Sequence, residues 1–240
     1  GRVVDVEYDP KNSNTIYAAA AFGGLWKSTS RGIAWTQIFP TEDMGSFSLC
    51  CIAIDPKDSN VLWLGTGEQN SQRSAHFGDG VYKSTDAGVT WKRVGLETSE
   101  YIGKILIDPR NSNTVWVASQ GPLFTEGGGG ERGLYKTTDG GATWTRSRFI
   151  NDTTGVTDIT FDAKNPDIMF AGTYQRMRHV GQMIGGGPDG GVFKTTNAGK
   201  TWEKLKIGLP PGEVGRIAVA TDPKVPGRVY ALIDAKRAGG

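Results

Sequence analysis

Side chains that could hold a ligand gather in two glycine-containing stretches of the sequence. In GEQNSQRSAHFGDG (67–80) they are Glu68, Gln69, Arg73 and His76, and in YQRMRHVGQMIGGGPDGG (174–191) they are Gln175, Arg176, Arg178 and His179. A guanidinium group can bind a carboxylate or phosphate through two parallel hydrogen bonds. We therefore predict that these eight residues form a ligand-contact region, and we assign none of them a catalytic role.

The favoured interpretation of the loop arginines is structural, because salt bridges within loops stiffen them. Arginines of this kind are Arg73, Arg132, Arg176 and Arg178, and their candidate partners are Glu68, Glu126, Glu131 and Asp189. The two histidines lie in different repeats, so no shared metal site is predicted. The glycine strings lack phosphate-loop spacing, and no cofactor is expected.

Glycoside hydrolysis is the second chemistry to consider, and it needs two carboxylates about 5 to 9.5 Å apart. Acidic residues are frequent in the same loops, yet nothing in the sequence pairs them. The catalytic residues of such an enzyme are therefore unknown at this level.

The elements that position these loops are repeats marked by tryptophan. Four copies read KSTSRGIAW (27–35), KSTDAGVTW (83–91), KTTDGGATW (136–144) and KTTNAGKTW (194–202), with their tryptophans 56, 53 and 58 residues apart. A DP-type turn, as in IDPKDSNVLW (54–63), recurs in step with them. Four short strands in each repeat of about 50 residues are typical of a β-propeller blade.

We therefore predict an all-β propeller of four-stranded antiparallel blades. The predicted blades span about 1–46, 47–100, 101–152 and 153–208, with a partial blade at 209–240. Half a blade leaves an open sheet edge. The chain is accordingly expected to be part of a larger propeller, completed by further blades of the same protein or by a partner chain.

The tryptophan motif is interpreted as a building block, because four copies on four blades cannot face one ligand. Glycine permits the turn, the acidic or amide side chain bonds the turn's backbone, and tryptophan packs between blades. The predicted structural residues are Gly32, Trp35, Asp86, Gly88, Trp91, Asp139, Gly141, Trp144, Asn197, Gly199 and Trp202. Strand alternation then places the long loops, and with them the ligand region, at the opposite face.

Composition excludes several classes of partner. The net charge of +2 is too small to predict nucleic-acid binding, and no apolar run is long enough to span a membrane. Cys50 and Cys51 are adjacent, so in a regular strand they point to opposite faces. They are predicted to be small buried residues and poor disulfide partners.

The repeated S/T-x-D-x-G-x-T-W motif resembles the Asp-box, or BNR, repeat of sialidases, some glycoside hydrolases and sortilin-type receptors. The wider sequence, including the segments GRVVDVEYDP and RGLYKTTDGG, looks most like that of bacterial sortilin-like or BNR-repeat glycosyl hydrolase-like proteins. That resemblance implies a secreted, periplasmic or envelope protein and as many as ten blades. The xyloglucan-cleaving Asp-box enzymes carry a catalytic aspartate where this chain has Ala21.

Two functions remain open from the sequence. The favoured one is an extracellular binding scaffold that recognises a peptide, protein or glycan through its long loops. The alternative is a glycoside hydrolase-type enzyme with catalytic carboxylates partly outside this segment. A purely structural subunit is a third possibility, and it predicts a broad apolar patch instead of a cleft.

Overall fold

The structure is a computed structural model that describes residues 2–39, 46–70, 75–124 and 129–235. Within these ranges the chain forms antiparallel strands joined by turns, and they contain no helix that could cross a membrane. The prediction of an all-β fold is confirmed.

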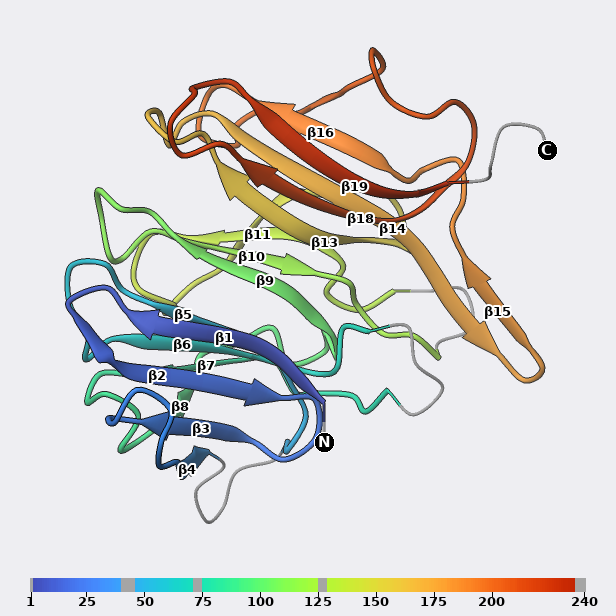
Figure 1. The fold of residues 1–240 in the computed structure, drawn as a ribbon. Helices are drawn as coiled ribbons and strands as arrows, with labels where there is room; N and C mark the ends of the chain where they lie inside the picture. Colours follow the sequence, from blue (N-terminus) through green and yellow to red (C-terminus); the bar gives the residue numbers. More distant parts are fainter. Residues whose placement is uncertain (1, 40–45, 71–74, 125–128, 236–240) are drawn as a thin grey trace. The chain divides into compact units, whose positions relative to one another are not determined.

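Successive strands lie side by side in sequence order, which is the meander of a propeller blade (Figure 1). The first sheet contains β1 (Val3–Asp9), β2 (Asn12–Ala20), β3 (Leu25–Ser28) and β4 (Thr36–Phe39). The second contains β5 (Leu49–Ile54), β6 (Leu62–Thr66), β7 (Val81–Ser84) and β8 (Lys92–Arg93). The third contains β9 (Ile102–Ile107), β10 (Val115–Ser119), β11 (Gly133–Thr137) and β12 (Thr145–Arg148).

The fourth sheet repeats this order and adds a strand. It contains β13 (Thr154–Phe161), β14 (Met169–His179), β16 (Gly191–Thr195) and β17 (Glu203–Lys204), and β15 (Gln182–Gly185) pairs with the far end of β14. The fifth sheet contains β18 (Val214–Thr221) and β19 (Val229–Ala235).

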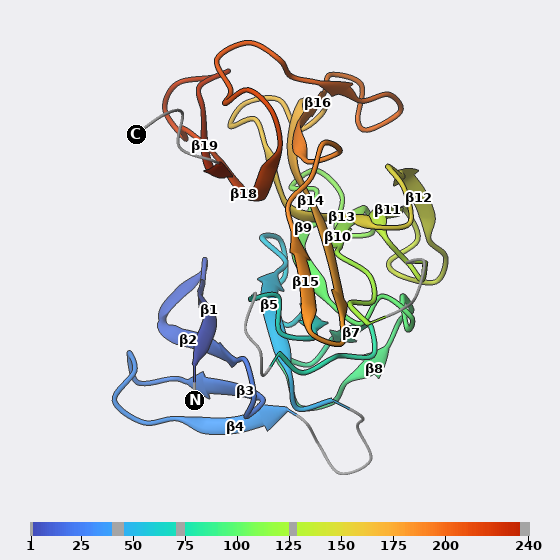
Figure 2. The ribbon, with the colours of Figure 1, turned by 90° about the vertical axis from the view of Figure 1, so that its right-hand side faces the viewer.

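The β14–β15 hairpin corrects the prediction of an irregular loop at 174–191 (Figure 2). His179 lies opposite Gln182, which leaves Val180 and Gly181 as a two-residue turn. Gly181 has a φ of 75° there, a conformation that suits glycine. The sequence concealed the hairpin because its strands are rich in arginine, glutamine and methionine.

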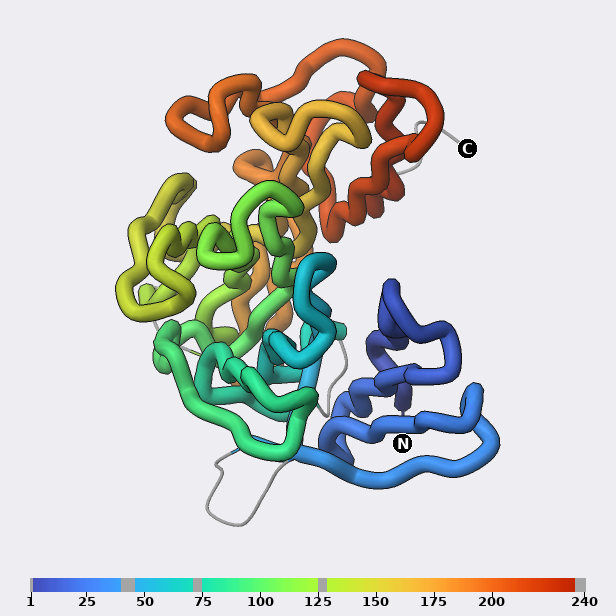
Figure 3. The backbone as a smooth tube through the Cα atoms, turned by 90° about the vertical axis from the view of Figure 1, so that its left-hand side faces the viewer, coloured from blue at the N-terminus to red at the C-terminus, as the bar shows by residue number. Residues whose placement is uncertain are grey.

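The chain divides into two compact units, 1–117 with 136–145 and 118–135 with 146–240. In the first unit, Tyr17, Phe39, Leu62 and Trp91 belong to one buried cluster. In the second, Val192 and Val214 pack with Ile217 and Val219. Figure 3 shows the first sheet, in blue, as a continuous back-and-forth path.

The first strand of two sheets carries a β-bulge beside an acidic side chain that bonds to the next sheet. The register of β1 shifts between Val3 and Asp5, and the Asp5 carboxylate accepts a 3.0 Å hydrogen bond from Ile52 N in β5. In the second unit, Asp158 of β13 accepts a 2.9 Å bond from Val219 N of β18. Because a bulge turns one side chain out of the regular alternation, it makes this sideways link possible.

Candidate functional site

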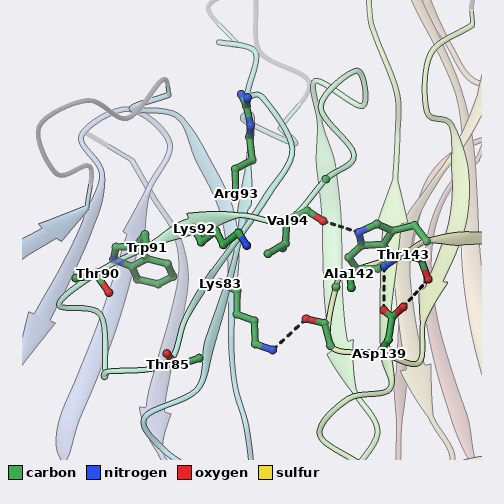
Figure 4. A pocket seen from close by; sticks show the side chains of 14 residues that line it. Lys83, Thr85, Thr90, Trp91, Lys92, Arg93, Val94, Asp139, Ala142 and Thr143 are labelled. Carbon is green, nitrogen blue, oxygen red and sulfur yellow. Dashed lines mark hydrogen bonds between the residues drawn. The ribbon is translucent and has the colours of Figure 1, made fainter.

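The tryptophan-motif hairpins are closed by hydrogen bonds among their own residues. Asp86 accepts bonds from Thr90 N at 2.8 Å and Thr90 Oγ1 at 2.6 Å, and Ser84 Oγ donates to it at 2.8 Å. Ser84 Oγ in turn accepts from Gly88 N at 2.9 Å. Asp139 makes the same contacts with Thr143 and Thr137, as Figure 4 shows for Thr143.

Three of the motif tryptophans bond to the preceding sheet. The indole nitrogens of Trp91, Trp144 and Trp202 donate to Ile38 O (3.1 Å), Val94 O (2.7 Å) and Ser147 Oγ (3.2 Å). Trp35 instead donates to Gly32 O of its own hairpin and is 39% exposed, so this ring does not pack between two sheets.

A cleft of about 650 Å³ lies between the second sheet and the hairpin of the third (Figure 4). Its lining includes Lys83, Lys92, Arg93 and Asp139. Lys83 donates to Gly140 O at 3.0 Å, and burial lowers its pKa, with Asp55 acting in the opposite direction. Lys83, Arg93 and Asp139 already bond to the scaffold, so the cleft is the groove between two repeats, and size alone does not make it a ligand site.

Exposed aromatic rings gather instead in the first unit, on the segments that follow β2, precede β5 and precede β7. We call Phe22, Phe47, His76 and Phe77 the aromatic platform; all four are exposed, and they line a hollow of about 290 Å³. Phe22 and His76 stack with ring centroids 4.6 Å apart and planes inclined by 28°. Phe47 lies 6.3 Å from Phe22 in a tilted arrangement.

Backbone bonds hold the three segments of the platform together. Phe47 O accepts bonds from Gly23 N and Gly24 N, each at 3.1 Å. The buried Ser48 hydroxyl bonds both Ala21 O at 2.8 Å and His76 O at 3.0 Å. Loops tied in this way present their rings with little ordering cost on binding.

The predicted ligand residues of the first unit have different environments. The side chain of Glu68 is fully buried, and both of its oxygens accept hydrogen bonds from the Arg2 guanidinium, at 2.9 and 2.7 Å. Its carboxylate is therefore not open to a ligand, and it pairs with Arg2, a cation that the sequence did not single out. Gln69 is half-buried, His76 belongs to the platform, and Arg73 lies outside the described residues.

The predicted ligand residues of the second unit lie in β14, not in a loop. Arg176 is buried and donates to Gln120 Oε1 at 3.5 Å, and Arg178 lies over the Phe124 ring. Gln175 donates to Thr153 Oγ1 at 3.2 Å, and His179 is half-buried beside the hairpin turn. These four residues share one strand.

Arg132 departs furthest from its expected place. It is 1% exposed and bonds to the main-chain oxygens of Gln120 and Pro122. These bonds tie Gln120 and Pro122 to Arg132 and leave its guanidinium inaccessible to a ligand. In the part of the chain that is described, no group of three or more histidine, cysteine, aspartate or glutamate side chains could hold a metal ion.

Sequence reasoning missed the phenylalanines of the platform. Their signal was an aromatic residue beside glycine or serine in a non-strand segment, as in AFGG, GSFS and HFGDG. Single exposed aromatics are common, so only their proximity in space makes them a surface.

Comparisons with known proteins agree with this architecture. The family model Sortilin-Vps10, described as sortilin, neurotensin receptor 3, matches residues 79–210. The xyloglucanase Xgh74A of Acetivibrio thermocellus is 30% identical over 176 residues, which are 59% of this chain and 19% of the relative. A probable oligoxyloglucan-reducing end-specific xyloglucanase of Neosartorya fischeri is 24% identical over 223 residues, covering 85% of this chain and 24% of the relative.

Among solved structures, an ancestral GH74 enzyme superposes with a TM-score of 0.70 at 22% identity. The superposition covers 99% of this chain and 30% of that enzyme, and it shows the propeller fold. The chain thus spans about a quarter or less of the length of the curated relatives above.

Proposed function

Because the chain belongs to the Sortilin-Vps10 family, we propose that it is a propeller segment of a secreted or envelope protein of glycoside hydrolase type. Its role in that protein is to bind a glycan on the aromatic platform. The observation that carries this proposal is the cluster of four exposed rings held by backbone bonds. Xyloglucanase relatives favour a glycan over the peptide or protein ligands that the sequence left open.

The chemistry of the platform suits a sugar. Sugar rings present C–H groups on their faces and hydroxyls at their rims, so flat aromatic rings can cover the former while polar loop atoms bind the latter. Asp79 lines the same hollow and is half-buried, so its carboxylate oxygens can accept hydrogen bonds from sugar hydroxyls. A polysaccharide is too large to enter a cell intact, so a protein that binds one acts outside the cytoplasm. This is why we assign the protein an extracytoplasmic location.

We assign hydrolysis to the complete protein, of which this chain is a segment, and not to the segment by itself. The position that resemblance links to a catalytic aspartate is Ala21, which is buried here. Glu68 is bonded to Arg2, and Asp79 accepts bonds from Tyr82 OH at 2.6 Å and Arg93 at 3.4 Å. Carboxylates engaged in this way are poorly placed as a general acid or nucleophile.

Isothermal titration calorimetry with xyloglucan oligosaccharides tests the proposal. We expect Phe22→Ala and Phe77→Ala each to weaken binding by about tenfold, because each removes part of the apolar contact. Ile33→Ala is the matched control, since Ile33 is 88% exposed on the tryptophan-motif hairpin of the first sheet. Equal binding by all variants, or equal loss in the control, would refute the platform.

Two further outcomes separate the alternatives. A peptide that binds at Phe22 and Phe77 when no glycan does would restore the binding-scaffold interpretation. Release of reducing ends from xyloglucan by this chain alone would place a catalytic carboxylate pair within it, against the assignment above.

A further inference from the structure

The adjacent residues Cys50 and Cys51 do not point to opposite faces, contrary to the expectation for a regular strand. The register of β5 shifts between Leu49, opposite Thr66, and Cys51, opposite Gly65, so Cys50 is the extra residue of a β-bulge. A bulge breaks the alternation of side chains. The two sulfur atoms consequently lie 2.9 Å apart.

The space around the two sulfurs is shaped by Gly65 of β6. A Cβ at this position would lie 2.8 Å from Cys51 Sγ and 2.9 Å from Cys50 Sγ. The glycine is needed there for room and not for backbone conformation, because its φ is not positive. The side chain of Ile102 in β9 borders the same space, since its Cγ2 would lie 2.7 Å from a Cβ at Gly65. The sulfurs are therefore enclosed by β5, β6 and β9 of the first unit.

We propose that Cys50 and Cys51 are a redox-active pair that closes to a disulfide between adjacent residues. The oxidant is a small-molecule disulfide such as oxidised glutathione. One cysteine thiolate attacks it, forming a mixed disulfide and releasing one glutathione thiolate. The second cysteine then attacks the mixed disulfide, so that the Cys50–Cys51 bond forms, a second glutathione thiolate leaves, and the two cysteine protons pass to the released thiolates.

Burial sets when this exchange takes place. Both cysteines are at most 1% exposed, and burial raises the pKa of the Cys50 thiol well above its usual value. Because only the thiolate attacks, exchange is slow in the folded chain and occurs during folding or local opening of β5. Once formed, the bond is shielded from reductants by the same burial.

The bond is expected to be labile in the unfolded chain. Consecutive Cα atoms are about 3.8 Å apart, which is shorter than the separation of about 4.4–6.8 Å usual in disulfides. Such strained bonds have higher reduction potentials than structural ones. The redox state of the pair is therefore set while β5 is open and is then retained at the bulge, one residue before Ile52, whose amide bonds to Asp5.

Differential alkylation of the chain tests the proposal. The protein is folded in buffers of reduced and oxidised glutathione, denatured with iodoacetamide, and analysed by intact mass and peptide mapping. We expect the 50–51 peptide to carry no alkyl group and to be lighter by two hydrogen atoms after oxidising folding, but to carry two alkyl groups after reducing folding. The number of alkyl groups is measured on unfolded chains, so the result does not depend on how stably a variant folds.

Cys50→Ser and Cys51→Ser are matched controls that leave one thiol. Each should be alkylated or carry a glutathione group, and neither should show the loss of two hydrogen atoms. Two alkylated cysteines in wild type at every glutathione ratio would overturn the proposal. So would glutathione on one cysteine alone, or a disulfide between two chains.

Discussion

At the scale of single residues, the motif aspartates act through the hydrogen bonds that they accept. Asn197 occupies the same place in the fourth hairpin, and its Oδ1 accepts bonds from Thr195 Oγ1 and Thr201 N at 2.9 Å each. Its Nδ2 donates to Thr201 Oγ1 at 2.8 Å, which reverses the direction of the bond between Thr90 and Asp86. An amide oxygen thus replaces the carboxylate oxygen. The charge is not what closes the turn.

The pH dependence of Asp86 follows from those bonds. Hydrogen bonds from Thr90 and then Ser84 lower its pKa to about 2, against about 3.9 in an unfolded chain. A depressed pKa contributes stability that is complete above pH 4 and is lost as the pH falls toward 2. We expect the carboxyl carbon signal of Asp86, followed by NMR, to titrate near pH 2.

Asp86→Asn supplies the control. This variant should fold at neutral pH, as Asn197 does in its hairpin, and should lose the Asp86 contribution to acid sensitivity. Titration of the wild-type group near pH 3.9 would show that the bonds are not maintained in solution.

At the scale of elements, the tryptophans differ in what they join. Trp91 is 8% exposed and bonds across to β4, whereas Trp35 is 39% exposed and bonds within its hairpin. Among the described sheets the first has no predecessor, so Trp35 has no preceding sheet to contact, whereas Trp91 packs against one.

Alanine substitution should separate the two roles. We expect Trp91→Ala to lower the free energy of unfolding by about 3–5 kcal/mol, since it leaves a large cavity. Trp35→Ala should cost less than about 1 kcal/mol. Urea unfolding followed by circular dichroism measures both, and similar losses would contradict the distinction.

At the scale of the whole molecule, two surfaces of apolar residues are uncovered among the described residues. Val3, Trp26 and Trp35 line an open hollow of about 540 Å³ on the first sheet. In the second unit, Leu232 of β19 is 78% exposed, and among described strands β19 pairs with β18 alone. Apolar faces and open strand edges promote association.

We accordingly expect the 240-residue chain to self-associate with rising concentration in sedimentation velocity. Trp26→Lys and Leu232→Lys should each shift the distribution toward monomer, because a charge opposes burial of these surfaces. Ile207→Lys is the control, since Ile207 is 97% exposed and belongs to neither surface. Wild-type sedimentation that does not change with concentration would count against this prediction.

The sequence alone determined the repeat, and with it the blades. Four tryptophan motifs and the recurring DP turns specify hairpins whose bonds are local, so position along the chain is sufficient to predict them. For the same reason the order of the four main strands in each complete sheet follows from the sequence, whereas β15 does not.

The tertiary structure decided which side chains meet. Arg2 and Glu68, Phe22 and His76, and Asp5 and Ile52 are 47 to 66 positions apart, and no local pattern links them. The bulge at Cys50 also depends on pairing with β6, which the alternation of residues in β5 could not indicate. A motif predicts the turn that it forms by itself, whereas a binding surface or a thiol pair arises only when neighbouring strands fix how distant residues face one another.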